Sequence, residues 1–309
     1  MKVKEFFKNI SPFNNREDMP KALYIIKKAL AFFLIYALFV GIGEVIVIGI
    51  TMAMGYDPLH GVLPSVDVVM LMKYYGFVVF FVVTLLYCKL FEKRKIKSLG
   101  FNKRVFDYFI GAVLAVFLLT VIVSVCCVTG VMSFGGFTSG TDVLYLLALF
   151  AGFLIQGSAE ELVCRGFLLP SLLKKTSIPV AVLVSSTAFA LPHLPTVLEA
   201  DPQFALVGVI NLYLVSAVFS LLFILRSNIY IVCGLHSVWN FVLNGAMGLS
   251  VSGSNSNENS LLNFNVNAQN ILSGGAYGVE ASVVTAVLLG IAIVVLVKLC
   301  HKRGIKNGF

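Results

Sequence analysis

Eight long runs of apolar residues recur along the chain, and they constrain its fold more than any other feature. A membrane-spanning helix needs about 20 apolar residues, and the runs cover roughly 29–53, 69–91, 106–132, 143–170, 179–194, 204–225, 229–249 and 278–299. The chain is 59% hydrophobic and only 12% charged, whereas a soluble domain is about 45–50% apolar and about 25% charged. The sequence therefore predicts an all-α polytopic membrane protein with about eight transmembrane helices.

The basic residues are confined to alternate connections between these runs. Of the 23 Lys and Arg residues, 21 lie in the tail 1–28, the loop 89–104, the pair 174–175, Arg226 and the segment 298–306. The other connections, 54–68, 133–142, 195–203 and 250–277, contain neither residue type. Basic residues crowd cytoplasmic loops, so both termini are predicted to be cytoplasmic. The net charge of +8 then reflects topology and contact with anionic lipids at the cytoplasmic face, and does not indicate nucleic-acid binding.

This pattern divides the chain into a basic cytoplasmic tail, 1–28, and a single transmembrane helical domain, 29–309. The first apolar run lacks the features of a cleaved signal peptide. The polar connection 250–277 is expected to be solvated and flexible. The six cysteines lie in or at the ends of apolar runs, which argues against a disulfide framework. No pair of matching halves, typical of many transporters, is evident.

Two adjacent carboxylates and an arginine stand at the end of one apolar run. Glu160, Glu161 and Arg165 lie within 143–170, and one charge at the bilayer centre costs at least about 2.5–3.5 kcal/mol. Three charges in one helix therefore indicate a functional site. Glu161 and Arg165 are four residues apart and can form an ion pair on one face. Glu160 is rotated by about 100°, so it can face a cavity.

Other scarce polar residues fall within neighbouring runs. His193 ends the fifth run, and His236 and Asn240 are four residues apart in the seventh. At about 1.5 Å per residue, His236 lies roughly 10 Å, and Glu160 and His193 roughly 15–21 Å, from the cytoplasmic end. A shared site in the central to cytoplasmic part of the membrane is therefore feasible. Each residue alone also fits a structural role, as a core histidine, helix–helix contact or structural ion pair.

Two further charged residues lie outside this group. Glu44 in the first run has no evident partner, and a structural role is favoured over a place in the site. Lys73 is the exception to the charge pattern, because it lies near the outer end of the second run. It is expected to extend its ammonium group toward the interface.

The motifs Glu160-Glu161-x-x-x-Arg165, Phe189-x-x-x-His193 and His236-x-x-x-Asn240 together resemble those of the CAAX prenyl protease type II family, also called the CPBP or Abi family. These proteins are intramembrane endopeptidases, and the resembling core covers about 143–249. The resemblance implies that Glu160 and His193 activate a water molecule. It implies oxyanion donors at His236 and Asn240, and a supporting role for Glu161 and Arg165.

The resemblance leaves the cofactor and the biological role open. Two histidines and a glutamate also suit zinc, but H-E-x-x-H is absent and a metal-independent mechanism is favoured. The implied substrate is a membrane-associated peptide or protein that reaches the site from the cytoplasmic leaflet. The bacterial branch, linked to peptide maturation and bacteriocin self-immunity, fits best, which predicts a bacterial cell membrane. The alternatives are a non-proteolytic membrane scaffold or immunity factor, and a proton-coupled transporter.

Overall fold

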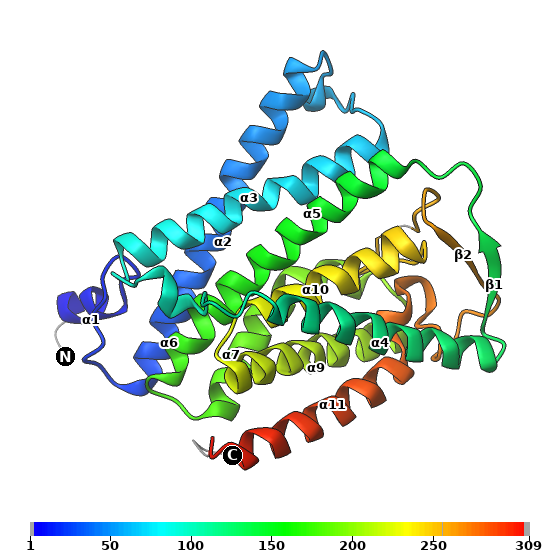
Figure 1. The fold of residues 1–309 in the computed structure, drawn as a ribbon. Helices are drawn as coiled ribbons and strands as arrows, with labels where there is room; N and C mark the ends of the chain where they lie inside the picture. Colours follow the sequence, from blue (N-terminus) through cyan, green and yellow to red (C-terminus); the bar gives the residue numbers. More distant parts are fainter. Residues whose placement is uncertain (1–2, 255, 306–309) are drawn as a thin grey trace.

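Each predicted apolar run forms a helix in the computed structural model, which describes residues 3–254 and 256–305 (Figure 1). Helices are favoured in a bilayer because they satisfy every backbone hydrogen bond within the segment. In chain order the long helices are α2 (Lys21–Ala53), α3 (Val66–Leu90), α4 (Asp107–Val128), α5 (Val143–Glu161), α7 (Ile178–Ala190), α9 (Pro202–Arg226), α10 (Tyr230–Phe241) and α11 (Val283–Lys302). The predicted all-α class is therefore confirmed.

Among the described residues, seven helices are long and apolar enough to span a membrane. Two of them are composite, because α5 continues through η3 (Leu162–Leu168) into α6 (Leu169–Leu173), and α7 continues through η4 (Leu191–His193) into α8 (Leu194–Leu198). The seventh predicted span, 229–249, forms a shorter helix than expected. Its helix α10 ends at Phe241 and is extended only by η5 (Val242–Ala246).

Helix α10 lies in the middle of the bundle, where glycines bring it close to α4 and α5 (Figure 1). A Cβ added at Gly234 would lie 2.0 Å from the Tyr108 carbonyl oxygen of α4. A Cβ at Gly157 of α5 would lie 2.6 Å from Oγ of Ser237. Small residues allow such close helix crossings in membranes. These crossings hold α10 beside the acidic part of α5.

The basic connections meet at one end of the bundle, here called the basic end. Nζ of Lys28 lies 2.7 Å from Oε1 of Glu92, and Arg94 donates to Oγ of Ser171 at 3.1 Å. Arg303 donates to the Leu225 carbonyl at 3.1 Å. These contacts join the loops that the charge pattern placed on one side. Lys2 and Lys306 lie outside the described residues.

The N-terminal segment differs from the predicted surface tail. It contains a short helix, α1 (Val3–Ile10), and α2 begins at Lys21, within the predicted tail. Lys27 and Lys28 are fully buried. Nζ of Lys27 donates to Oδ1 of Asn14 at 2.8 Å, so the ammonium group keeps a polar partner. Part of the predicted tail is thus integrated into the helical domain.

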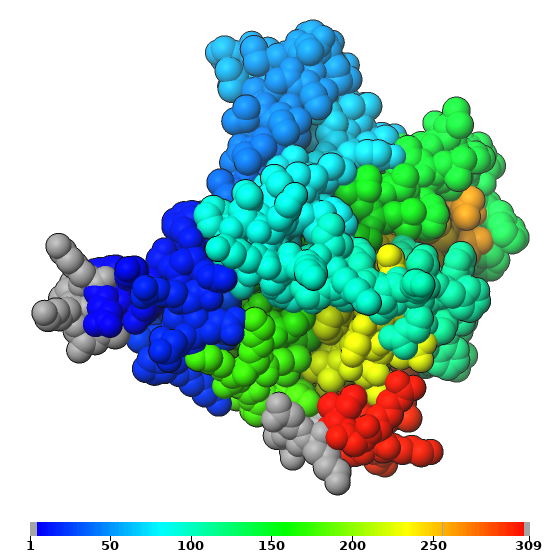
Figure 2. Space-filling view, turned by 60° about the vertical axis from the view of Figure 1, so that its left-hand side comes forward, coloured from blue at the N-terminus to red at the C-terminus, as the bar shows by residue number. Residues whose placement is uncertain are grey.

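The opposite, non-basic end carries the structure's short sheet. Strand β1 (Met132–Phe137) pairs antiparallel with β2 (Leu262–Val266), with an irregularity between Phe134 and Gly136. The connection 250–277 was predicted to be flexible, but the part described here is held by this pairing and by packing. Figures 1 and 2 also show that the outer half of α2 and the connection 54–65 project from the rest of the molecule.

Candidate active site

Glu161 and Arg165 form the predicted ion pair at the junction of α5 and η3. Their side chains are fully buried, and Nη1 of Arg165 lies 3.0 Å from Oε1 of Glu161. Nη2 of Arg165 also donates to the Ser216 carbonyl of α9 at 3.1 Å and to the hydroxyl of Ser216. The guanidinium lies 4.8 Å from the ring centroid of Phe189. Arg165 therefore ties α5 to α9 and balances the charge of Glu161.

Arg165 lies in η3, a π-helical segment of seven residues. Such wide turns are rare and occur often at functional sites. Gly166 allows the segment to pack closely, since a Cβ there would lie 3.1 Å from the Leu99 carbonyl oxygen and 3.0 Å from Cδ1 of Leu162. The local backbone thus places a buried arginine between helices rather than against lipid.

His236 on α10 joins the two glutamates. Its Nδ1 lies 2.9 Å from Oε1 of Glu161. An ionised carboxylate only accepts hydrogen bonds, so Nδ1 carries the hydrogen and Nε2 points the other way. Nε2 lies 3.8 Å from Oε2 of Glu160. Phe219 stacks on the imidazole with ring centroids 5.2 Å apart, so His236 is held in one orientation.

Glu160 has one carboxylate oxygen engaged and one without a hydrogen-bond partner. Nε2 of Gln156, one turn earlier on α5, donates to Oε1 at 2.6 Å. Oε1 of Gln156 in turn accepts from Nδ2 of Asn240 at 2.8 Å. Oε2 of Glu160 is buried and has no hydrogen-bond partner among the described residues. Gln156 therefore connects Glu160 to Asn240 and leaves Oε2 available.

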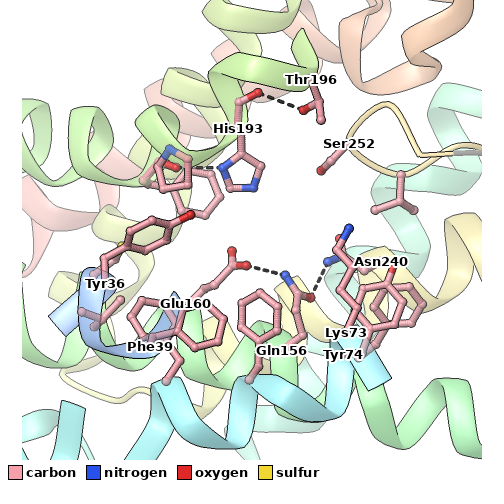
Figure 3. A pocket seen from close by; sticks show the side chains of 18 of the residues that line it. Tyr36, Phe39, Lys73, Tyr74, Gln156, Glu160, His193, Thr196, Asn240 and Ser252 are labelled. Atoms are coloured by element: carbon pink, nitrogen blue, oxygen red, sulfur yellow. Dashed lines mark hydrogen bonds between the residues drawn. The ribbon is translucent and has the colours of Figure 1, made fainter. Parts of the chain in front are cut away.

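His193 faces Glu160 from the other side of a cavity (Figure 3). Its Nδ1 lies 2.9 Å from the Phe189 carbonyl oxygen, one turn earlier. Because a carbonyl only accepts, Nδ1 must donate, and neutral His193 has its lone pair on Nε2. The Phe189 ring packs against the imidazole with centroids 4.9 Å apart. The motif residue Phe189 thus fixes both the tautomer and the position of His193.

The cavity between these residues has a volume of about 310 Å³ and is lined mainly by apolar and aromatic side chains. Glu160, His193, Asn240 and Gln156 are among its polar lining residues. The exposed lining residues are Lys73, Thr196 and Gly253, all in the half of the bundle toward the non-basic end. The mouth therefore lies toward the non-basic end.

The sequence-predicted residues separate into two groups in the structure. Glu160, His193 and Asn240 line the cavity, while Glu161, Arg165 and His236 form a buried network behind Glu160. Nε2 of His236, the atom expected to donate to the oxyanion, lies 3.8 Å from Oε2 of Glu160.

Three other residues bear on the sequence predictions. Lys73, which was predicted to extend toward the interface, is exposed and also lines the cavity. Glu44 is exposed on the projecting half of α2 and does not line the cavity. Gln156 was missed, although its four-residue spacing from Glu160 is the signal that identified the Glu161–Arg165 pair.

The polar residues of the site also bear on metal binding. Among the described residues, no group of three or more His, Cys, Asp or Glu side chains is arranged to hold a metal ion. Nδ1 of His193 and Nδ1 of His236 are both engaged, by a carbonyl and by Glu161. These contacts engage only Nδ1 of each ring and leave Nε2 as the nitrogen that would meet a metal; no step below is assigned to a metal.

Residues 142–242 match a family model described as type II CAAX prenyl endopeptidase, Rce1-like. The matched range contains all the predicted site residues, from Glu160 to Asn240. This match confirms, for that part of the chain, the resemblance that the motifs predicted. Comparisons with curated proteins and with solved structures found no match.

Proposed function

We propose that this multi-pass membrane protein is an intramembrane endopeptidase that hydrolyses a peptide bond of a membrane-associated peptide or protein. The observation that carries the proposal is the facing pair in the cavity. The unpartnered Oε2 of Glu160 and the Nε2 lone pair of His193 lie on opposite sides of one space (Figure 3). The match to type II CAAX prenyl endopeptidases over 142–242 agrees with this chemistry.

The two acceptors are suited to one water molecule. A water between them donates one hydrogen to Oε2 of Glu160 and the other to Nε2 of His193, so its lone pair is free to attack a carbonyl carbon. Glu160 takes the proton as the C–O bond forms, which is general base catalysis and contributes about 10²–10⁴-fold. Transfer of that proton to the departing nitrogen breaks the C–N bond and gives a carboxylic acid and an amine.

The oxyanion needs hydrogen-bond donors on the far side of the carbonyl. An amide nitrogen carries two hydrogens, and Asn240 uses one of them toward Gln156. The second is free to donate to the oxyanion, and such donors are worth more in a dry site than in water. Protonated His236 would carry a hydrogen on Nε2, 3.8 Å from Oε2 of Glu160, and would supply the second oxyanion donor that the family resemblance implies.

The buried network of Glu161, Arg165 and His236 supports Glu160. Glu161 orients His236, and Arg165 neutralises Glu161, so the acidic pair can remain in the membrane interior without excess negative charge. We propose that Glu161 and Arg165 act only through His236 and Glu160. Peptide maturation and bacteriocin self-immunity, the roles linked to the bacterial branch of the family, are the processes in which this activity would serve.

The test compares the purified wild type with Glu160→Ala and His193→Ala variants on a panel of quenched-fluorescent membrane peptides in detergent. We expect cleavage by the wild type and losses of at least about 10²-fold in both variants. Cleavage that survives both substitutions would refute the assignment. Movement of peptide across vesicles without cleavage would support a transporter, and activity lost to a chelator and restored by one metal would support zinc.

A further inference from the structure

The mouth of the cavity has a definite direction along the bundle. Helix α5 runs from the non-basic end toward the basic end, so Gln156 and Phe153 lie on the mouth side of Glu160, while Val163 and Cys164 lie beyond it. Val163 and Cys164 are 1% and 2% exposed. The cavity is therefore closed beyond Glu160 toward the basic end.

Contacts between α2, α3 and η3–α6 close that end. The Tyr24 hydroxyl donates to the Ser171 carbonyl at 3.0 Å, and Arg94 donates to the carbonyls of Gly166 and Phe167 at 3.2 Å. The buried Lys28–Glu92 ion pair adds a further link between α2 and the connection after α3. A peptide entering from the basic end would have to break these polar contacts.

The rim of the mouth is linked through Glu280 to α10, the helix that carries His236 and Asn240. The segment 251–254 forms part of the cavity wall, and the Ser252 amide donates to Oε2 of Glu280 at 2.6 Å. Oε1 of Glu280 accepts from Nε1 of Trp239 at 2.9 Å, and Trp239 precedes Asn240. Glu280 thus fixes the rim of the mouth relative to α10.

We propose that the substrate reaches Glu160 through this mouth, from the extracytoplasmic side of the membrane. Basic connections mark the cytoplasmic side, and the mouth lies at the end whose connections, 54–68, 133–142, 195–203 and 250–277, have no Lys or Arg. This inference rests on the proposed peptidase function. It specifies the substrate class as a peptide, or a segment of an anchored protein, that is exposed at or delivered from the extracytoplasmic face.

The first experiment tests the side of access with one peptide from the detergent panel, coupled to a charged polymer that cannot cross membranes. It is added to sealed right-side-out vesicles, to inside-out vesicles and to detergent-opened samples of both. We expect cleavage in right-side-out vesicles at a rate close to the opened sample, and at least tenfold less in inside-out vesicles. The reverse ratio overturns the proposed side of access, whereas failure to cleave in every detergent sample overturns the peptidase function instead.

The second experiment does not depend on catalysis. Thr196→Cys at the mouth and Lys174→Cys at the basic end are labelled with a membrane-impermeant maleimide, and the wild type, with its six cysteines, measures the background. We expect Thr196→Cys to be labelled in right-side-out vesicles and Lys174→Cys only in inside-out vesicles. Labelling of Thr196→Cys only in inside-out vesicles overturns the proposal.

Discussion

The hydrogen-bonded bridge made by Gln156 between Glu160 and Asn240 allows a direct test of the roles proposed for these side chains. Gln156 is 7% exposed and donates to Glu160 at 2.6 Å while accepting from Asn240 at 2.8 Å. Gln156→Ala removes both contacts and frees Glu160 to rotate. A hydrogen bond to a charged group is worth about 1.5–3 kcal/mol. If all of it is lost in the transition state, kcat falls by about 10- to 150-fold.

Gln156→Glu separates positioning from packing. The substitution nearly preserves the shape of the side chain, so a residue that only fills space would tolerate it better than alanine. In the structure, however, it would place a second carboxylate 2.6 Å from Oε1 of Glu160. Two carboxylates at such a distance share a proton, so Glu160 would no longer serve as a base. We therefore expect Gln156→Glu to lose about 10²–10⁴-fold in kcat, more than Gln156→Ala.

The assay measures kcat and KM on the peptide cleaved by the wild type, with thermal unfolding in detergent as the folding check. Gln203→Ala, on the exposed first turn of α9, is the matched control and should retain wild-type kinetics. The double variant Gln156→Ala/Asn240→Ala should lose less than the product of the single losses, because the two side chains share one hydrogen bond. Wild-type kcat in folded Gln156→Glu would refute the reasoning.

Three further predictions concern stability and docking. Arg165→Met leaves the buried Glu161 charge without its arginine partner and should lower the free energy of unfolding by about 3–5 kcal/mol. The double variant Arg165→Met/Glu161→Gln should recover most of this loss in thermal unfolding. A double variant as unstable as Arg165→Met would contradict the prediction. Gly234→Leu should prevent the α4–α10 crossing and abolish the monodisperse peak in size-exclusion chromatography, whereas Gly41→Leu, with open space at its Cβ, should not. Partial burial alone would raise the pKa of Glu17, but its hydrogen bond and charge interaction with Lys174 lower it below the usual value. Docking of the N-terminal segment should therefore hold at neutral pH and be lost only as the pH falls below about 4, as measured by protease cleavage of the segment; release between pH 6 and 7 would contradict the assignment.

The helices and their grouping were predictable because the bilayer imposes strong rules. Long apolar runs and alternating basic connections are written directly in the sequence, and the structure gathers those basic connections at one end. The Glu161–Arg165 pair followed from helical spacing alone. The shortness of α10 has a local signal that the prediction missed, because Asn244-Gly245 follows the regular helix and such a pair favours a turn.

Contacts between distant segments were beyond sequence reasoning. Strands β1 and β2 pair across more than a hundred residues of chain, and neither strand has a strong local pattern. The same limit applies to the mouth, since its rim combines Lys73, Thr196 and Gly253 from three parts of the chain. Lys73 was expected to extend toward the interface, which any lysine near a helix end can do. Its further place in the cavity wall depends on how α3 packs, which the sequence does not show.

Glu160 and Glu161 are neighbours in sequence, and the geometry explains why only one can be the base. Both have a buried Oε2 without a hydrogen-bond partner among the described residues, so that feature alone does not separate them. Glu161 is fully buried, is paired with Arg165 and His236, and does not line the cavity. A water at Glu161 could not reach a substrate carbonyl, and protonation there would weaken two charge-assisted contacts. Glu160 borders the cavity opposite His193, so a proton taken up there comes from a water that is already positioned for attack.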